Sequence, residues 1–114
     1  MINVNWDTSS VNDMESMFYG NIIFDQDIST WPTTTPVSVD KMFRESTYNR
    51  PLPNWKIDGT DGNAMRDTFR DNTNFNQDIS GWDVSDVIGF TSTFRNATAF
   101  NQDLSSWDVG GATG

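Results

Sequence analysis

The sequence contains no histidine and no cysteine in its 114 residues. Nucleophilic sites built on a Ser–His or Cys–His pair are therefore excluded, and so are zinc sites with imidazole or thiolate ligands. The chain also lacks a Walker loop and a dinucleotide-binding fingerprint. Carboxylate pairs are present, but no pattern marks one of them as part of a converging catalytic group. We therefore expect neither enzymatic activity nor a cofactor.

Basic residues are few, since 7 Lys and Arg stand against 16 Asp and Glu and give a net charge of −9. This charge opposes binding to nucleic acid and to anionic membrane surfaces. No apolar run reaches the roughly 18 residues that a transmembrane helix needs. The first five residues, Met-Ile-Asn-Val-Asn, have neither the basic start nor the apolar stretch of a signal peptide. Taken alone, the composition predicts a soluble domain that is neither inserted into a membrane nor exported.

A repeat is the dominant feature of what the sequence does contain. Residues 75–84 read Phe-Asn-Gln-Asp-Ile-Ser-Gly-Trp-Asp-Val, and residues 100–109 differ from them at two positions. Looser copies occupy residues 24–31 and 48–55, and all five tryptophans fall in one slot, 24 to 27 residues apart. Such a period indicates a solenoid, in which neighbouring units bury a shared core and offer a binding surface. The repeats of this single domain span residues 6–30, 31–54, 55–81 and 82–106, with a partial unit at 107–114.

Two apolar patterns alternate within each unit. Val11, Met14, Met17 and Phe18 lie at helical spacing, as do their counterparts in later units: Val39, Met42, Phe43, Met65, Phe69, Val87, Phe90 and Phe94. Around each tryptophan the pattern changes to the apolar–polar alternation of a short strand. The expected fold is therefore an α/β, right-handed, leucine-rich-repeat-like solenoid with one short strand and one helix per repeat of 24–27 residues.

Two columns of aligned residues have structural interpretations. The tryptophan column is predicted to be core rather than a platform for carbohydrate, because it is flanked by other repeated apolar positions. A second column places Asp25, Asn49, Asn76 and Asn101 at one turn position of every unit. Such side chains hydrogen-bond nearby backbone groups, so this column is predicted to form a ladder between units.

The spacings Ile79-x-x-Trp82-x-Val84 and Leu104-x-x-Trp107-x-Val109 resemble the strand signature of leucine-rich repeats, with Trp in the second slot. The chain is similar to the BspA-like leucine-rich repeats of bacterial surface proteins, which also occur in Mycoplasma-type lipoproteins. Arg50-Pro51, Pro32 and two extra residues between Trp55 and Phe69 depart from that pattern.

The resemblance implies an extracellular or cell-surface location. It also implies a non-catalytic role in recognition or adhesion, with a protein partner or a host-surface ligand. The alternative is a structural module that either self-assembles or acts as a calcium-stabilised spacer.

Stacking of the repeats would bring aspartates together, Asp78 beside Asp103 and Asp83 beside Asp108. Backbone N–H groups in turns can satisfy these carboxylates, and a bridging Ca²⁺ is the alternative. The calcium candidates are Asp58, Asp61, Asp78 and Asp103. Residues 58–63 superficially resemble a calcium loop, but the twelfth position from Asp58 is Phe69 and not the acidic residue of an EF-hand.

Two irregular loops, residues 32–36 and 56–63, follow the tryptophans of adjacent units, and insertions in repeat arrays often mark the binding face. The candidate contact surface comprises Asp7, Pro32, Lys56, Asp58, Asp61, Asp83 and Asp108.

At the C-terminal end the predicted strand at Trp107–Val109 has no following helix to cover it. The sequence therefore predicts a homodimer that joins two such edges about a two-fold axis, and suggests a piece of a longer protein.

Overall fold

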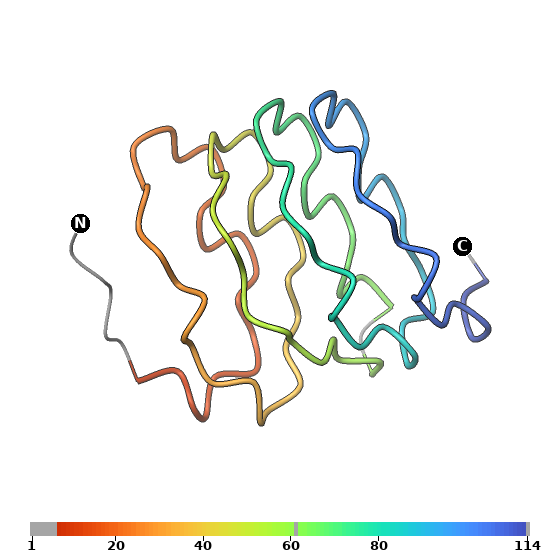
Figure 1. The fold of residues 1–114 in the computed structure, drawn as a ribbon. Coiled ribbons are helices and arrows are strands. Elements are labelled where there is room, and N and C mark those ends of the chain that lie inside the picture. Colours follow the sequence, from red (N-terminus) through yellow and green to blue (C-terminus); the bar gives the residue numbers. More distant parts are fainter. Residues whose placement is uncertain (1–6, 61, 114) are drawn as a thin grey trace.

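The repeats lie side by side as successive circuits of the chain in the computed structural model, which describes residues 7–60 and 62–113. We call these circuits coil 1 (residues 7–30), coil 2 (31–54), coil 3 (55–81) and coil 4 (82–106). They follow one another in chain order from the N-terminal to the C-terminal side of the molecule (Figure 1). Residues 107–113 begin a further circuit, and Thr113 N–H donates to the carbonyl of Ile88 at 2.9 Å.

The expected α/β solenoid is wrong, because the described residues form neither a helix nor an extended strand. In place of strands there are three isolated parallel bridges, Asp13–Ser38, Val37–Ile57 and Lys56–Asp83. It follows that no helix long and apolar enough to cross a membrane is present in the described ranges.

Each predicted helix is replaced by a chain of tight turns that we call the turn ribbon, at residues 14–21, 39–46, 65–72 and 90–97. Within a ribbon, N–H groups donate to the carbonyl three residues earlier, as Met42 does to Val39 and Arg44 to Lys41. Every fourth residue is left-handed: Ser16, Gly20, Lys41, Glu45, Asp67, Asp71, Ser92 and Asn96 have φ between 51° and 67°. An α-helix cannot contain such residues.

Hydrogen bonds between coils offset the cost of these left-handed residues, which is about 1–3 kcal/mol for each one that is not glycine. Nine N–H groups of the ribbons donate to carbonyls of the following turn ribbon at 2.8–3.0 Å. The donors are Ser16, Phe18, Gly20, Lys41, Phe43, Glu45, Asp67, Phe69 and Asp71. The backbone polar groups that a helix would pair internally are thus shared between turns and neighbouring coils.

Aromatic rings form the core in columns that run through the stack. Phe18, Phe43, Phe69 and Phe94 stack with centroid separations of 5.6, 5.7 and 5.7 Å. The predicted burial of the tryptophans is confirmed for Trp31, Trp55 and Trp82, which are no more than 3% exposed. Trp107 is half-buried, and Trp6 lies outside the described residues.

The predicted asparagine ladder is also confirmed. Asn49 Oδ1 accepts the backbone N–H of Asn76 and the side-chain amide of Gln77, both at 2.9 Å. Asn76 Oδ1 accepts the same pair of donors from Asn101 and Gln102, again at 2.9 Å. Between coils 1 and 2 an ion pair replaces this arrangement, because Arg50 donates to both carboxylate oxygens of Asp25. The apparent irregularity at Arg50 is therefore matched by Asp25 in the preceding coil.

Candidate functional site

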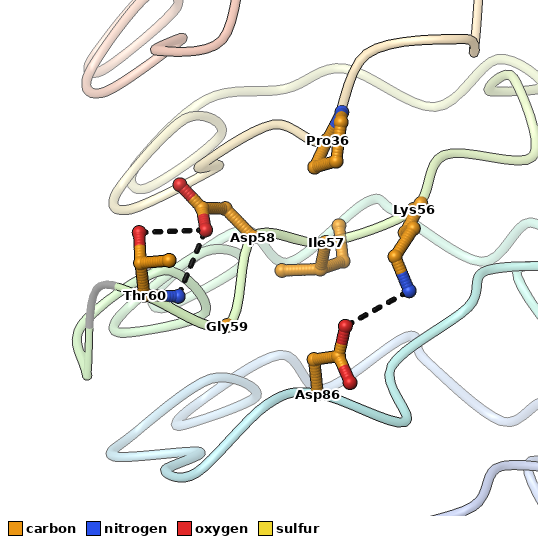
Figure 2. A pocket seen from close by; sticks show the side chains of 7 residues that line it. All are labelled: Pro36, Lys56, Ile57, Asp58, Gly59, Thr60 and Asp86. Atoms are coloured by element: carbon orange, nitrogen blue, oxygen red, sulfur yellow. Dashed lines mark hydrogen bonds and ion pairs between the residues drawn. The ribbon is translucent and has the colours of Figure 1, made fainter.

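The two irregular loops meet at a pocket of about 390 Å³ (Figure 2). Its lining residues are Pro36, Lys56, Ile57, Asp58, Gly59, Thr60 and Asp86. The backbone beneath it is fixed by two hydrogen bonds, from Val37 N–H to the carbonyl of Lys56 at 3.0 Å and from Asp58 N–H to the carbonyl of Val37 at 2.8 Å. Ile57 is fully buried, so the pocket rests on the core.

Lys56 provides the positive charge of the pocket. Its ammonium nitrogen lies 3.0 Å from a carboxylate oxygen of Asp86 and 3.3 Å from one of Asp83. Hydrogen bonds to Asp86 and Asp83 raise the pKa of Lys56. The side chains of these three residues are 39–59% exposed, so solvent screens each pair and its contribution to stability is small. These charges therefore set the electrostatic character of the pocket more than they stabilise the fold.

Asp58 closes a turn at the other side of the pocket. One of its carboxylate oxygens accepts the backbone N–H and the hydroxyl of Thr60, both at 2.8 Å (Figure 2). This pairing fixes the direction of the carboxylate. The lining groups therefore comprise one ammonium and two carboxylates beside the apolar carbons of Ile57 and Pro36.

Gly59 holds coil 3 close to coil 4 at this pocket. A Cβ atom at Gly59 would lie 2.4 Å from the carbonyl oxygen of Asp86 and 2.5 Å from its Cβ. Two atoms of the neighbouring coil thus occupy the space of a side chain, and only glycine permits this approach.

The structure places the predicted contact residues in two groups. Lys56 and Asp58 line the pocket and Asp83 pairs with Lys56, whereas Asp7 and Asp108 cap separate turns at the first and last described circuits. Pro32 is exposed and does not line the pocket, and Asp61 lies outside the described residues. Sequence reasoning missed Asp86, which has no repeated counterpart to draw attention to it.

The stacked aspartates are satisfied within their own turns. Asp78 Oδ1 accepts Ser80 N–H at 2.9 Å, and Asp103 Oδ1 accepts Ser105 N–H at 2.8 Å. Both carboxylates line a second pocket of about 210 Å³. Even so, no group of three or more acidic, histidine or cysteine side chains within residues 7–60 and 62–113 could hold a metal ion. The calcium candidates Asp58, Asp78 and Asp103 therefore act as turn caps here.

Turn capping by aspartate recurs along the chain and makes stability depend on pH. Hydrogen bonds from the serine two residues later lower the pKa of Asp7, Asp27, Asp78, Asp83 and Asp103 from the ordinary value of 3.8. A carboxyl whose pKa is lowered on folding contributes stability above its unfolded pKa, and that contribution is lost as the pH falls through the folded pKa. We expect the denaturation midpoint to fall when the pH is lowered below about 4.

Urea denaturation followed by circular dichroism between pH 7 and pH 3 measures this dependence. The matched control is Asp78→Asn, which keeps an oxygen for Ser80 but does not titrate, so its pH dependence should be shallower. A midpoint that rises on acidification would contradict the prediction and would show that repulsion among the 16 acidic residues outweighs the caps.

One family model matches nearly the whole chain, in two overlapping segments at residues 2–62 and 58–113. Its description is "Mycoplasma protein of unknown function, DUF285". No curated protein matches the chain significantly, and no solved structure does.

Proposed function

We propose that this chain, which belongs to the family described as "Mycoplasma protein of unknown function, DUF285", is a non-catalytic module that recognises a protein partner at a bacterial cell surface. Kinship with the BspA-like surface repeats is part of the proposal and rests on the repeated decapeptide. The proposal does not include the α/β architecture expected from that kinship.

Convergence of the irregular loops at one pocket is the observation that carries the proposal. Residues 32–36 and 56–63 depart from the repeat, and Pro36 and residues 56–60 line the same pocket. Insertions in repeat arrays collect on the binding face, whereas regular positions form the core. The absence of histidine and cysteine from the sequence favours binding over catalysis.

The chemistry of the pocket favours a basic side chain of the partner. Asp58 and Asp86 provide carboxylates, and the exposed ring of Pro36 provides apolar contact for the methylene groups of lysine or arginine. The net charge of −9 attracts basic partners at long range.

Panning a library of random peptides against the immobilised chain tests the proposal. We expect enrichment of peptides that contain lysine or arginine, and loss of their binding to the double variant Asp58→Asn with Asp86→Asn. The matched control is Asp78→Asn with Asp103→Asn, which removes the same charge at the second pocket and should keep the binding. Equal binding by both variants, or no enrichment, would overturn the proposed site.

Location at the cell surface is a separate part of the proposal with its own test. Antibody labelling of intact cells should detect the chain without permeabilisation. Labelling only after permeabilisation would refute a surface location while leaving the peptide-binding result unaffected.

A further inference from the structure

Ile88 is an exposed aliphatic side chain beside the loop pocket, and the recognition role proposed above gives it no part. It is 46% exposed, whereas Val87 before it is 2% exposed and belongs to the core. Asp86, on the other side of Val87, is exposed and lines the pocket. Asp86 and Ile88 therefore both lie at the surface, and the buried side chain between them anchors the segment to the core.

Two glycines of the irregular loop at residues 56–63 bring that loop against these two side chains. A Cβ atom at Gly59 would lie 2.5 Å from Cβ of Asp86, and one at Gly62 would lie 3.4 Å from Cδ1 of Ile88. Ile88 therefore packs across Gly62 and still remains exposed. The insertion that builds the pocket thus sets an acidic and an aliphatic side chain along one edge of the loop.

The circuit that follows coil 4 leaves Ile88 uncovered. Thr113 N–H donates to the carbonyl of Ile88 at 2.9 Å, so the chain already runs beside coil 4 at this point. A Cβ atom at Gly111 would lie 3.6 Å from the carbonyl oxygen of Ser85 and 3.9 Å from that of Val87. Because glycine has no side chain, this segment passes coil 4 without covering the pocket edge. Ile88 is 46% exposed with the segment in place.

Both carboxylates of the pocket keep one oxygen for a partner. One oxygen of Asp58 accepts the two hydrogen bonds from Thr60, and one oxygen of Asp86 lies 3.0 Å from the ammonium nitrogen of Lys56 (Figure 2). The second oxygen of each carboxylate accepts no hydrogen bond from a described residue. A lysine or arginine of a partner can therefore bind here while Lys56 stays in place.

We propose that the pocket recognises a peptide segment with two anchors, a basic residue that binds Asp58 and Asp86 and, within about three residues of it, an aliphatic or aromatic residue that packs on Ile88. This proposal rests on the recognition role proposed above and adds a second contact that determines its specificity. Asp86 and Ile88 are two positions apart, so their Cα atoms are at most about 7 Å from each other. Side chains that are close in the sequence of one extended peptide span the same distance.

Panning the library of random peptides against the wild-type chain and against Ile88→Ser tests the proposal. The wild-type chain should select peptides in which lysine or arginine stands within about three positions of an aliphatic or aromatic residue. Ile88→Ser should still select lysine or arginine but should lose the apolar preference. The matched control is Ile22→Ser, which removes an aliphatic side chain that is 70% exposed in the turn after the coil 1 ribbon. This control should select the same paired motif as the wild-type chain.

The affinity of one selected peptide separates the two contacts. With the peptide fluorescently labelled and binding followed by anisotropy, Ile88→Ser should weaken binding by about five- to tenfold, because it removes one apolar contact. This factor should be the same at low and at high salt. Asp86→Asn should also weaken binding, but by a factor that shrinks as the salt concentration rises. Ile88 lies outside the core, so the denaturation midpoint of Ile88→Ser should stay close to that of the wild-type chain.

The possible outcomes distinguish this proposal from the recognition role on which it rests. Selection of lysine or arginine without a nearby apolar residue would overturn the contact with Ile88 and leave the pocket as a binding site. An apolar preference that persists in Ile88→Ser would have the same consequence. If the wild-type chain selects no lysine or arginine, the pocket itself is not the binding site, and both proposals are overturned.

Discussion

Replacing Trp82 by alanine is expected to lower the free energy of unfolding by about 3–5 kcal/mol, the range for large-to-small changes of a buried aromatic side chain. Trp82 is 3% exposed, and its ring lies 5.5 Å from Trp55 and 6.0 Å from Phe69, measured between centroids. Alanine would leave a cavity in the middle of the stack, where coils on both sides limit relaxation. Urea denaturation followed by circular dichroism measures the loss.

Two controls separate the packing effect from other causes. Trp82→Phe should cost much less, because it keeps an aromatic ring and the indole N–H of Trp82 has no hydrogen-bond partner among the described residues. Asp83→Ala should cost about 1 kcal/mol, since it removes the cap on Ser85 and the ion pair with Lys56. Equal midpoints for Trp82→Ala and Asp83→Ala would show that the tryptophan contributes little to packing.

The structure corrects one expectation about Asp83. The sequence analysis placed this carboxylate beside that of Asp108, and from that placement alone its removal would be expected to relieve repulsion between the two. Instead, the carboxylate accepts the N–H of Ser85 at 3.0 Å and its hydroxyl at 2.6 Å, and pairs with Lys56 at 3.3 Å. Its removal is therefore expected to destabilise the fold.

Replacing Asn72 by alanine is expected to cost about 2–4 kcal/mol, because buried polar groups that lose a partner cost about 1–3 kcal/mol each. Asn72 is fully buried. Its side-chain oxygen accepts the N–H groups of Asn74 and Phe75, both at 3.0 Å, and its amide donates to the carbonyl of Tyr48 at 3.3 Å. Alanine would leave the Phe75 N–H and the Tyr48 carbonyl unpaired inside the stack.

Asn21 offers a matched control for this prediction. It makes the same turn in coil 1, accepting the N–H groups of Ile23 and Phe24 at 2.9 and 2.8 Å, but it is only half-buried. Water can reach the groups that Asn21→Ala would expose, so its cost in urea denaturation should be less than half that of Asn72→Ala. Similar costs would mean that the turn itself, rather than its burial, sets the energy.

The prediction of a helix in each unit, around Phe18, Phe43, Phe69 and Phe94, was wrong for a geometric reason. A turn ribbon with a left-handed residue every fourth position repeats at nearly the same interval as an α-helix. Met14 and Phe18, or Met65 and Phe69, therefore face the core in either structure. The distinction lies in φ at positions such as Lys41 and Asp67, where the residue type alone does not indicate a left-handed backbone.

Repetition explains which predictions succeeded. The burial of the tryptophans and the asparagine ladder were predictable because each pattern occurs in several coils. One interpretation therefore had to suit all of the copies. The position of the loop pocket was also predictable, because Lys56 and Asp58 belong to an insertion that breaks the period. Asp86 and Gly59 were not, since their roles arise from one contact between neighbouring coils that the sequence pattern does not encode.

The asparagine ladder also decides which units of the chain can be duplicated. Coils 3 and 4 each carry an Asn followed by a Gln at these positions, and both pairs donate to the Asn of the preceding coil, so any number of such units can follow one another with every rung paired. Arg50 of coil 2 requires the carboxylate of Asp25 below it. A tandem copy of coil 2 would set a second Arg50 against Asn49, a neutral side chain. Growth of the array by gene duplication is therefore easier from coils 3 and 4, where residues 75–84 and 100–109 are nearly identical.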